Sequence, residues 1–205
     1  MSDDLAGYTA FEPWRYANII HKSEHRQRWR SLTDSFFYAS EILVHQIAAD
    51  RDGRDREGLA AIFLFRHYLE LMLKSIILNG RWLERANKNA AKKPEPVKRI
   101  HQLSKLWEGV LQDARPKIPD DSWGRYDIAF IELCIAEFDA VDQRGFSFRY
   151  AGEEGDFCLF DYRTLARVMD HIRQILEGID TCLAEGYAEN KEYESYLLSE
   201  LGPEY

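Results

Sequence analysis

Apolar residues recur at three- and four-residue intervals over most of this chain, which is the periodicity of helices that bury one face. The first such stretch covers residues 28–50, and a second begins at Leu59. The second is predicted to end at Asn79–Gly80, because glycine often follows the last turn of a helix. Two more helices are predicted, one from Ile100 and one over 122–141, with the prolines of "PKIPDD" between them.

The pattern changes in "GFSFRYAGEEGDFCLF", where aromatic residues alternate with other residues before a glycine-rich turn. This alternation predicts a short hairpin or ordered loop near residues 146–160. Asp161 follows as a predicted helix N-cap, because its carboxylate can accept hydrogen bonds from the first backbone amides of a helix. Helical spacing then resumes and ends near Leu201.

These elements predict an all-α fold, a bundle of five to six helices around one core. We expect one helical domain over residues 1–205, with its core at about 28–185. An N-terminal arm, 1–27, precedes this core, and a C-terminal helix at 187–201 follows it. The chain is 45% apolar and 13% aromatic, which is enough to fill such a core.

The charge and the cysteines narrow the function classes. A formal net charge of −8 argues against a surface dominated by phosphate contacts, although a local basic groove is compatible with it. Three separated cysteines form no CxxC pair, so disulfides and a zinc site are unsupported, and we expect no metal and no cofactor. The N-terminus lacks a signal-peptide pattern, and no stretch has the length and apolarity of a membrane span. We therefore expect a cytoplasmic protein that does not associate with membranes.

Polar residues interrupt the apolar run "IFLFRHYLELMLKSII" at one-turn intervals. Arg66, Glu70 and Lys74 lie at i, i+4 and i+8, so the carboxylate can reach both cations, and His67 lies beside them. One interpretation is an ion-pair network between helices that fixes their packing. The other is a ligand site for an anion, in which arginine and lysine bind phosphate and Glu70 orients them.

The Arg-x3-Glu-x3-Lys helix, together with the later "HQLSKLW" containing His101, resembles the helix pair of the HEPN superfamily (higher eukaryotes and prokaryotes nucleotide-binding). "FSFRY" at 146–150, before an acidic loop and a long helix, resembles uncharacterised prokaryotic members of this group. The resemblance covers about residues 30–185. It implies a helical bundle that forms a homodimer and works in a toxin–antitoxin, antiphage defence or RNA-processing system, in some members as a metal-independent endoribonuclease.

Catalytic members of that superfamily carry an arginine and a histidine separated by four to six residues on a late helix. Here Arg167 and His171 occupy that place with three residues between them, and they are the candidate catalytic pair. The wider spacing occurs only in Arg15 and His21, near the N-terminus. RNA cleavage needs a base, an acid and a cation, which arginine and histidine can supply. A solvated helix face is the alternative interpretation of Arg167 and His171.

The remaining ligand-binding candidates are His101 and Arg149. His101, near a helix start, can bond a backbone group or a glutamate instead, and Arg149 can stack on a neighbouring aromatic ring instead of binding phosphate. Three functions therefore stay open. The first is a HEPN-like protein of a defence or toxin-type system, related to RNA and with or without catalysis, acting as a homodimer whose interface buries apolar surface of the later helices. The second is a non-catalytic subunit that docks a larger effector protein, and the third is a nucleotide sensor.

Overall fold

The structure is a computed structural model that describes residues 25–49, 55–88, 97, 100–119, 125–141 and 161–201. These residues form α-helices, one short 3-10 helix and no strand, which confirms the predicted all-α bundle. The predicted hairpin or loop near 146–160 lies outside the described residues. The elements are α2 (His25–Ala49), α3 (Asp55–Asn87), α4 (Leu103–Asp113), η1 (Arg115–Lys117), α5 (Arg125–Val141) and α6 (Tyr162–Leu201).

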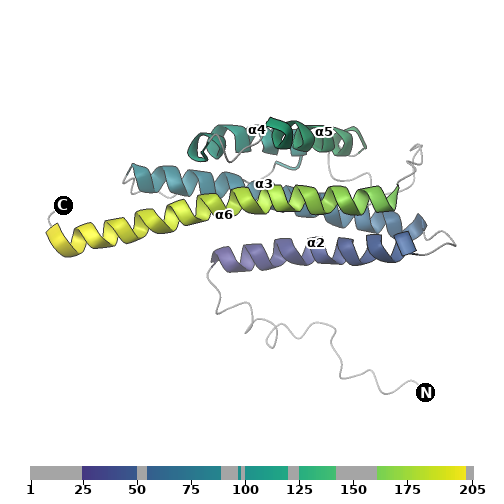
Figure 1. Ribbon diagram of the computed structural model, residues 1–205, viewed down its shortest axis with the longest axis horizontal. Coiled ribbons are helices and arrows are strands. Elements are labelled where there is room, and N and C mark those ends of the chain that lie inside the picture. The colour runs from purple at the N-terminus through teal and green to yellow at the C-terminus, as the bar shows by residue number, and fades with distance from the viewer. Residues whose placement is uncertain are drawn as a thin grey trace, which may run out of the picture.

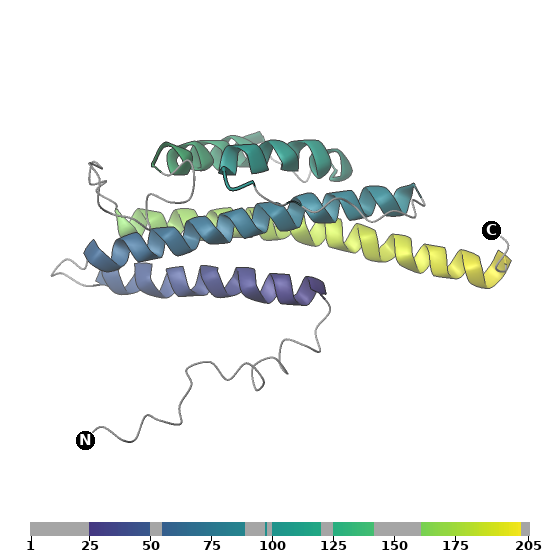
Figure 2. The same ribbon diagram turned by 180° about the vertical axis from the view of Figure 1, so that it is seen from behind.

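The helices form three layers (Figures 1 and 2). The long helices α3 and α6 run side by side in the middle layer, α2 covers one side of this pair, and α4 and α5 cover the other. In both views the C-terminal end of α6, drawn in yellow, extends past the ends of the other helices. This arrangement buries α3 on several sides, which explains why its sequence is apolar almost all the way round.

One hydrophobic core joins every α-helix of the described chain. Phe37 and Val44 of α2 are buried against it, and so are Phe65 and Ile76 of α3. The other helices contribute residues that recur mainly at three- and four-residue intervals, as the sequence periodicity predicted. Among them are Leu103, Leu106 and Val110 of α4, Ile131 and Ile135 of α5, and Met169, Ile172, Leu176 and Leu183 of α6.

The predicted end of the second helix at Asn79–Gly80 is wrong, because α3 continues to Asn87. Gly80 lies inside this helix, where the end of α4 comes close to it. A Cβ atom at this position would lie 2.8 Å from the carbonyl carbon of Asp113 and 2.9 Å from Cα of Ala114. Glycine is therefore needed here for the close approach of two backbones, and it does not mark the end of the helix.

The beginning of α6 matches its prediction, whereas its continuation does not. The Asp161 carboxylate accepts hydrogen bonds from the Arg163 amide at 3.1 Å and from the Thr164 hydroxyl, so Asp161 caps the helix. The separate C-terminal helix expected at 187–201 does not exist, because α6 is one helix of 40 residues. Gly186 lies inside this helix, and a Cβ atom added there would make only ordinary contact with Leu83 of α3.

Candidate functional site

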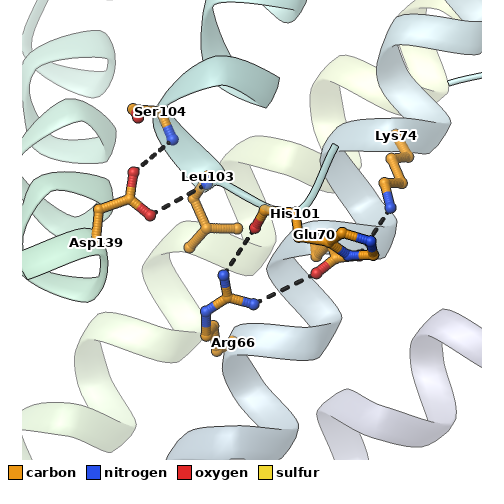
Figure 3. A network of polar contacts seen from close by, with 7 residues as sticks. All are labelled: Arg66, Glu70, Lys74, His101, Leu103, Ser104 and Asp139. Carbon is orange, nitrogen blue, oxygen red and sulfur yellow. Dashed lines mark hydrogen bonds and ion pairs between the residues drawn. The ribbon is translucent and has the colours of Figure 1, made fainter. Parts of the chain in front are cut away.

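The polar stripe of α3 is buried in the bundle (Figure 3). Arg66, Glu70 and Lys74 are only 2%, 4% and 9% exposed. The Glu70 carboxylate accepts a hydrogen bond from Lys74 Nζ at 2.7 Å through one oxygen and from Arg66 Nη1 at 3.3 Å through the other. Helical spacing thus places one carboxylate between two cations, as the sequence predicted.

His101 connects this stripe to the segment that precedes α4. Its backbone carbonyl oxygen accepts a hydrogen bond from Arg66 Nη2 at 2.7 Å. Its ring Nδ1 lies 2.9 Å from Glu70 Oε1, although the side chain is 55% exposed. We call Arg66, Glu70, Lys74 and His101 the Glu70 network; it fixes the chain just before α4 against α3.

Asp139 of α5 caps α4, a role that the sequence analysis missed. Gln102, the N-cap residue by position, makes no side-chain cap. Instead, the Asp139 carboxylate accepts hydrogen bonds from the backbone amides of Leu103 at 3.1 Å and Ser104 at 2.9 Å (Figure 3). A negative charge at a helix N-terminus is favourable. No local signal marks Asp139 as a cap, because it lies 35 residues or more from the amides that it binds.

The electrostatics of the Glu70 network favour its ionised form. Burial alone raises the pKa of the Glu70 carboxyl, but the hydrogen bonds and charges of Lys74 and His101 outweigh this effect and hold the pKa below its ordinary value. An anion bound by Arg66 or Lys74 therefore competes with Glu70, and the amides at the start of α4 already bind Asp139. The contacts are those of a structural network, and a ligand-binding role for these residues stays a prediction.

His67 lies apart from the Glu70 network, although it follows Arg66 directly. Its ring contacts Phe36 of α2 edge-on at a centroid distance of 4.4 Å and stacks on Phe63 at 6.2 Å. One residue on an α-helix is a rotation of about 100°, so adjacent residues face different neighbours. The structure thus places His67 between α2 and α3, whereas Arg66 points to the segment before α4.

Arg167 and His171 are both exposed on α6. The His171 ring contacts Phe130 of α5 edge-on, with a centroid distance of 4.8 Å. Arg167 and His171 are therefore accessible to a ligand from solvent, whereas Arg66 and Glu70 are buried. Arg149, and the pair Arg15 and His21, lie outside the described residues.

A second polar cluster, which the sequence analysis missed, joins α2 to α6. The Arg173 guanidinium donates to Glu177 Oε1 at 2.8 Å and to the Tyr38 hydroxyl at 2.9 Å, and it lies over the Phe37 ring at 4.5 Å. Nearby, burial raises the pKa of Tyr68 far above its ordinary value. The spacing of Arg173 and Glu177 by four residues was a local signal for their ion pair.

Asp180 of α6 is a third polar contact that holds the bundle together. It is 5% exposed and accepts hydrogen bonds from Ser75 Oγ at 3.2 Å and from the Asn79 amide of α3. These contacts satisfy a carboxylate that would be costly to bury alone.

A reactive cysteine, a metal site and a membrane-spanning helix each require particular features of the described residues. Burial raises the pKa of the Cys134 thiol to about 11, so this cysteine stays protonated and is a poor nucleophile. Within the described parts of the chain, no cluster of three or more His, Cys, Asp or Glu residues has the geometry to hold a metal ion. None of the described helices combines the length and the apolarity needed to cross a membrane.

Comparisons with known proteins add no assignment. No protein-family model matches the chain, and no curated protein or solved structure matches it either.

Proposed function

We propose that this chain is a cytoplasmic HEPN-like helical protein of a prokaryotic defence or toxin–antitoxin system, which binds RNA as a homodimer. The observation that supports it is the Glu70 network. Arg66, Glu70, Lys74 and His101 carry the sequence resemblance, and they lie in contact with one another although His101 is 31 residues from Glu70. The all-α bundle is also the fold that the resemblance implies.

The RNA-binding part of the proposal rests on Arg167 and His171. Both are exposed on the same helix one turn apart, so an RNA phosphate can reach them without disturbing the core. Arginine binds phosphate through its planar fork, and the histidine ring beside Phe130 offers a flat surface to a base. The Glu70 network, in contrast, supports the fold beneath.

The proposal includes weak or absent cleavage by the isolated chain. Arg167 and His171 are closer in sequence than the pair in catalytic HEPN proteins. Two subunits that converge on one phosphate need accurate placement, and a misplacement of about 1 Å can lower a rate on the order of a hundredfold. A partner protein of the same system is the component that would complete such a site.

The test combines binding and cleavage of single-stranded RNA and transfer RNA in the presence of a chelator. We expect binding with little cleavage, and we expect Arg167→Ala to lower the salt dependence of binding by about one phosphate contact. Lys105→Ala, which removes an exposed cation from α4, is the matched control and should leave this dependence unchanged. Absence of RNA binding would overturn the proposal. Robust cleavage that His171→Ala abolishes would overturn its non-catalytic part.

A non-catalytic interaction subunit is the second candidate function. It is favoured by large apolar side chains that α2 leaves exposed, among them Leu32 at 48% and Ile42 at 56%. Binding of a partner through this surface is compatible with RNA binding at Arg167 and His171. The His171 ring contacts Phe130 of α5, and α5 lies on the opposite side of the α3–α6 layer from α2 (Figures 1 and 2).

A further inference from the structure

From residue 31 to residue 49, the exposed positions of α2 include no Asp, Glu, Lys or Arg. We define the α2 outer face as the exposed positions from residue 31 to residue 49. Its three large side chains are Leu32, Tyr38 and Ile42, which are 48%, 47% and 56% exposed. The other members are small or neutral: Ser31, Ser35, Ala39, His45, Gln46 and Ala49. In a chain with 30% Asp, Glu, Lys and Arg residues, a face of this length without one of them is unusual.

The spacing of these residues indicates that the complementary surface is another helix. Residues 32, 35, 39, 42, 46 and 49 are separated alternately by three and four positions. This is the heptad spacing with which two helices pack side by side, knobs into holes. Figures 1 and 2 show α2 as one of the two outer layers, with its inner side against α3 and α6.

We propose that the α2 outer face pairs with the same face of a second copy of this chain, with the two α2 helices antiparallel. A chain of net charge −8 repels its copy over most of its surface, and an uncharged face is where two copies can meet without that repulsion. A two-fold dimer requires a surface that fits itself. The flanking positions satisfy the same condition: Tyr38 and His45 count as neutral in the formal charge, and the half-buried Phe36 and Leu43 are apolar.

The sequence of the face also fits an antiparallel pair in size. If Leu32 packs opposite Ala49 of the second copy, then Ser35 lies opposite Gln46 and Ala39 lies opposite Ile42. In each of these layers a larger side chain meets a smaller one, which is the condition for interdigitated packing. A parallel pair would instead place Ile42 on Ile42, Leu32 on Leu32 and the polar Gln46 on Gln46.

This inference rests on the proposed function for the existence of a homodimer. The position of the interface is inferred from α2 alone. It differs from the interface of later helices that the sequence suggested. The exposed side of α6 carries Arg167, Asp170, Glu185 and Glu189, so two copies would have to bring charges together there.

The first experiment is light scattering on the full chain without RNA. We expect a mass of twice 24.0 kDa, and we expect Ile42→Glu to raise the dimer dissociation constant at least about tenfold, since it places a carboxylate in each copy of an apolar interface. Leu133→Glu is the matched control: Leu133 is 59% exposed on α5, so the same substitution there should leave the dimer intact. Circular dichroism checks that both variants fold.

Disulfide cross-linking tests the antiparallel register. Leu32→Cys mixed with Ala49→Cys should give a cross-linked dimer under mild oxidation. Either variant alone should form no more cross-linked dimer than the wild-type chain, which has cysteines of its own. A monomeric wild-type chain, or a dimer that only Leu133→Glu disrupts, would overturn the inference. Cross-linking of Leu32→Cys to itself would overturn the antiparallel pairing. A dimer that does not bind RNA would overturn the proposed function and leave this interface standing.

Discussion

At the scale of single residues, Glu70 has a large expected effect on stability. It is 4% exposed and is the anion shared by Arg66, Lys74 and His101. Loss of this carboxylate leaves buried cations without a counter-charge, so Glu70→Leu should lower the free energy of unfolding by about 3 to 5 kcal/mol. Replacement of Arg66, Glu70 and Lys74 together by Met, Leu and Met should cost far less, because no unpaired charge remains.

Urea denaturation of these variants measures the contrast. Lys88→Met is the control, since its pair with Glu84 is exposed and should contribute less than about 1 kcal/mol. If Glu70→Leu unfolds with wild-type stability but loses RNA binding, the Glu70 network is a ligand site and its structural interpretation is wrong.

The pH dependence of stability gives a second prediction for Glu70. Its pKa in the folded protein lies below the ordinary value of 4.5, so the unfolded chain takes up a proton first as the pH falls. The stabilisation is complete above pH 4.5 and is lost as the pH falls through the folded-state pKa. Between neutral pH and about pH 3, the free energy of unfolding should therefore decline less steeply for Glu70→Gln than for the wild type.

Asp34 gives the opposite sign and serves as the comparison. Burial, the largest cause, raises the pKa of its carboxyl above 3.8, so its ionised form costs stability at neutral pH and the cost disappears on acidification. In the wild type, protonation of Asp34 adds to the free energy of unfolding as the pH falls, and Asp34→Asn should remove this pH-dependent contribution. Equal pH profiles for Glu70→Gln and the wild type would contradict the assignment for Glu70.

At the scale of elements, the close approach of α3 and α4 depends on Gly80. A methyl group there meets the Asp113 backbone, which cannot rotate away as a side chain can. Gly80→Ala should therefore destabilise the protein by at least about 1 to 3 kcal/mol, the usual cost of overpacking. Gly178 of α6 has open space around its Cβ position, so Gly178→Ala should stabilise by about 0.5 to 1 kcal/mol.

Thermal unfolding of the two variants checks this prediction. Both substitutions raise helix propensity by the same amount, so only the neighbouring backbone distinguishes them. A Gly80→Ala variant that gains as much stability as Gly178→Ala would contradict the packing described at the end of α4.

The elements also show which information a sequence carries locally. The periodicity of apolar residues located each helix of the described chain, and the spacing of Arg66, Glu70 and Lys74 predicted their ion pairs, because both signals lie within a few turns of one helix. Gly80 and Asp139 gave no such signal. Their roles depend on Asp113 and on the amides of α4, which the tertiary fold brings close from more than 30 residues away.

At the scale of the whole molecule, net charge separates the two proposed interactions. Two copies that each carry a charge of −8 repel each other, and salt screens this repulsion, with a Debye length that falls from about 30 Å at 0.01 M to about 10 Å at 0.1 M. An interface without charged residues loses no ion pairs on screening. Dimerisation through the α2 outer face should therefore strengthen as salt is added.

RNA binding should respond in the opposite direction, because contacts of cations such as Arg167 with phosphate release counterions and weaken as salt rises. Sedimentation equilibrium at several NaCl concentrations gives the dimer dissociation constant, and fluorescence anisotropy of a labelled RNA gives the binding constant in the same buffers. Ile42→Glu should raise the dimer dissociation constant at every salt concentration, and Arg167→Ala should flatten the salt dependence of the RNA-binding constant. A dimer that dissociates on addition of salt would show that ion pairs hold it, and the uncharged face of α2 would then not be its interface.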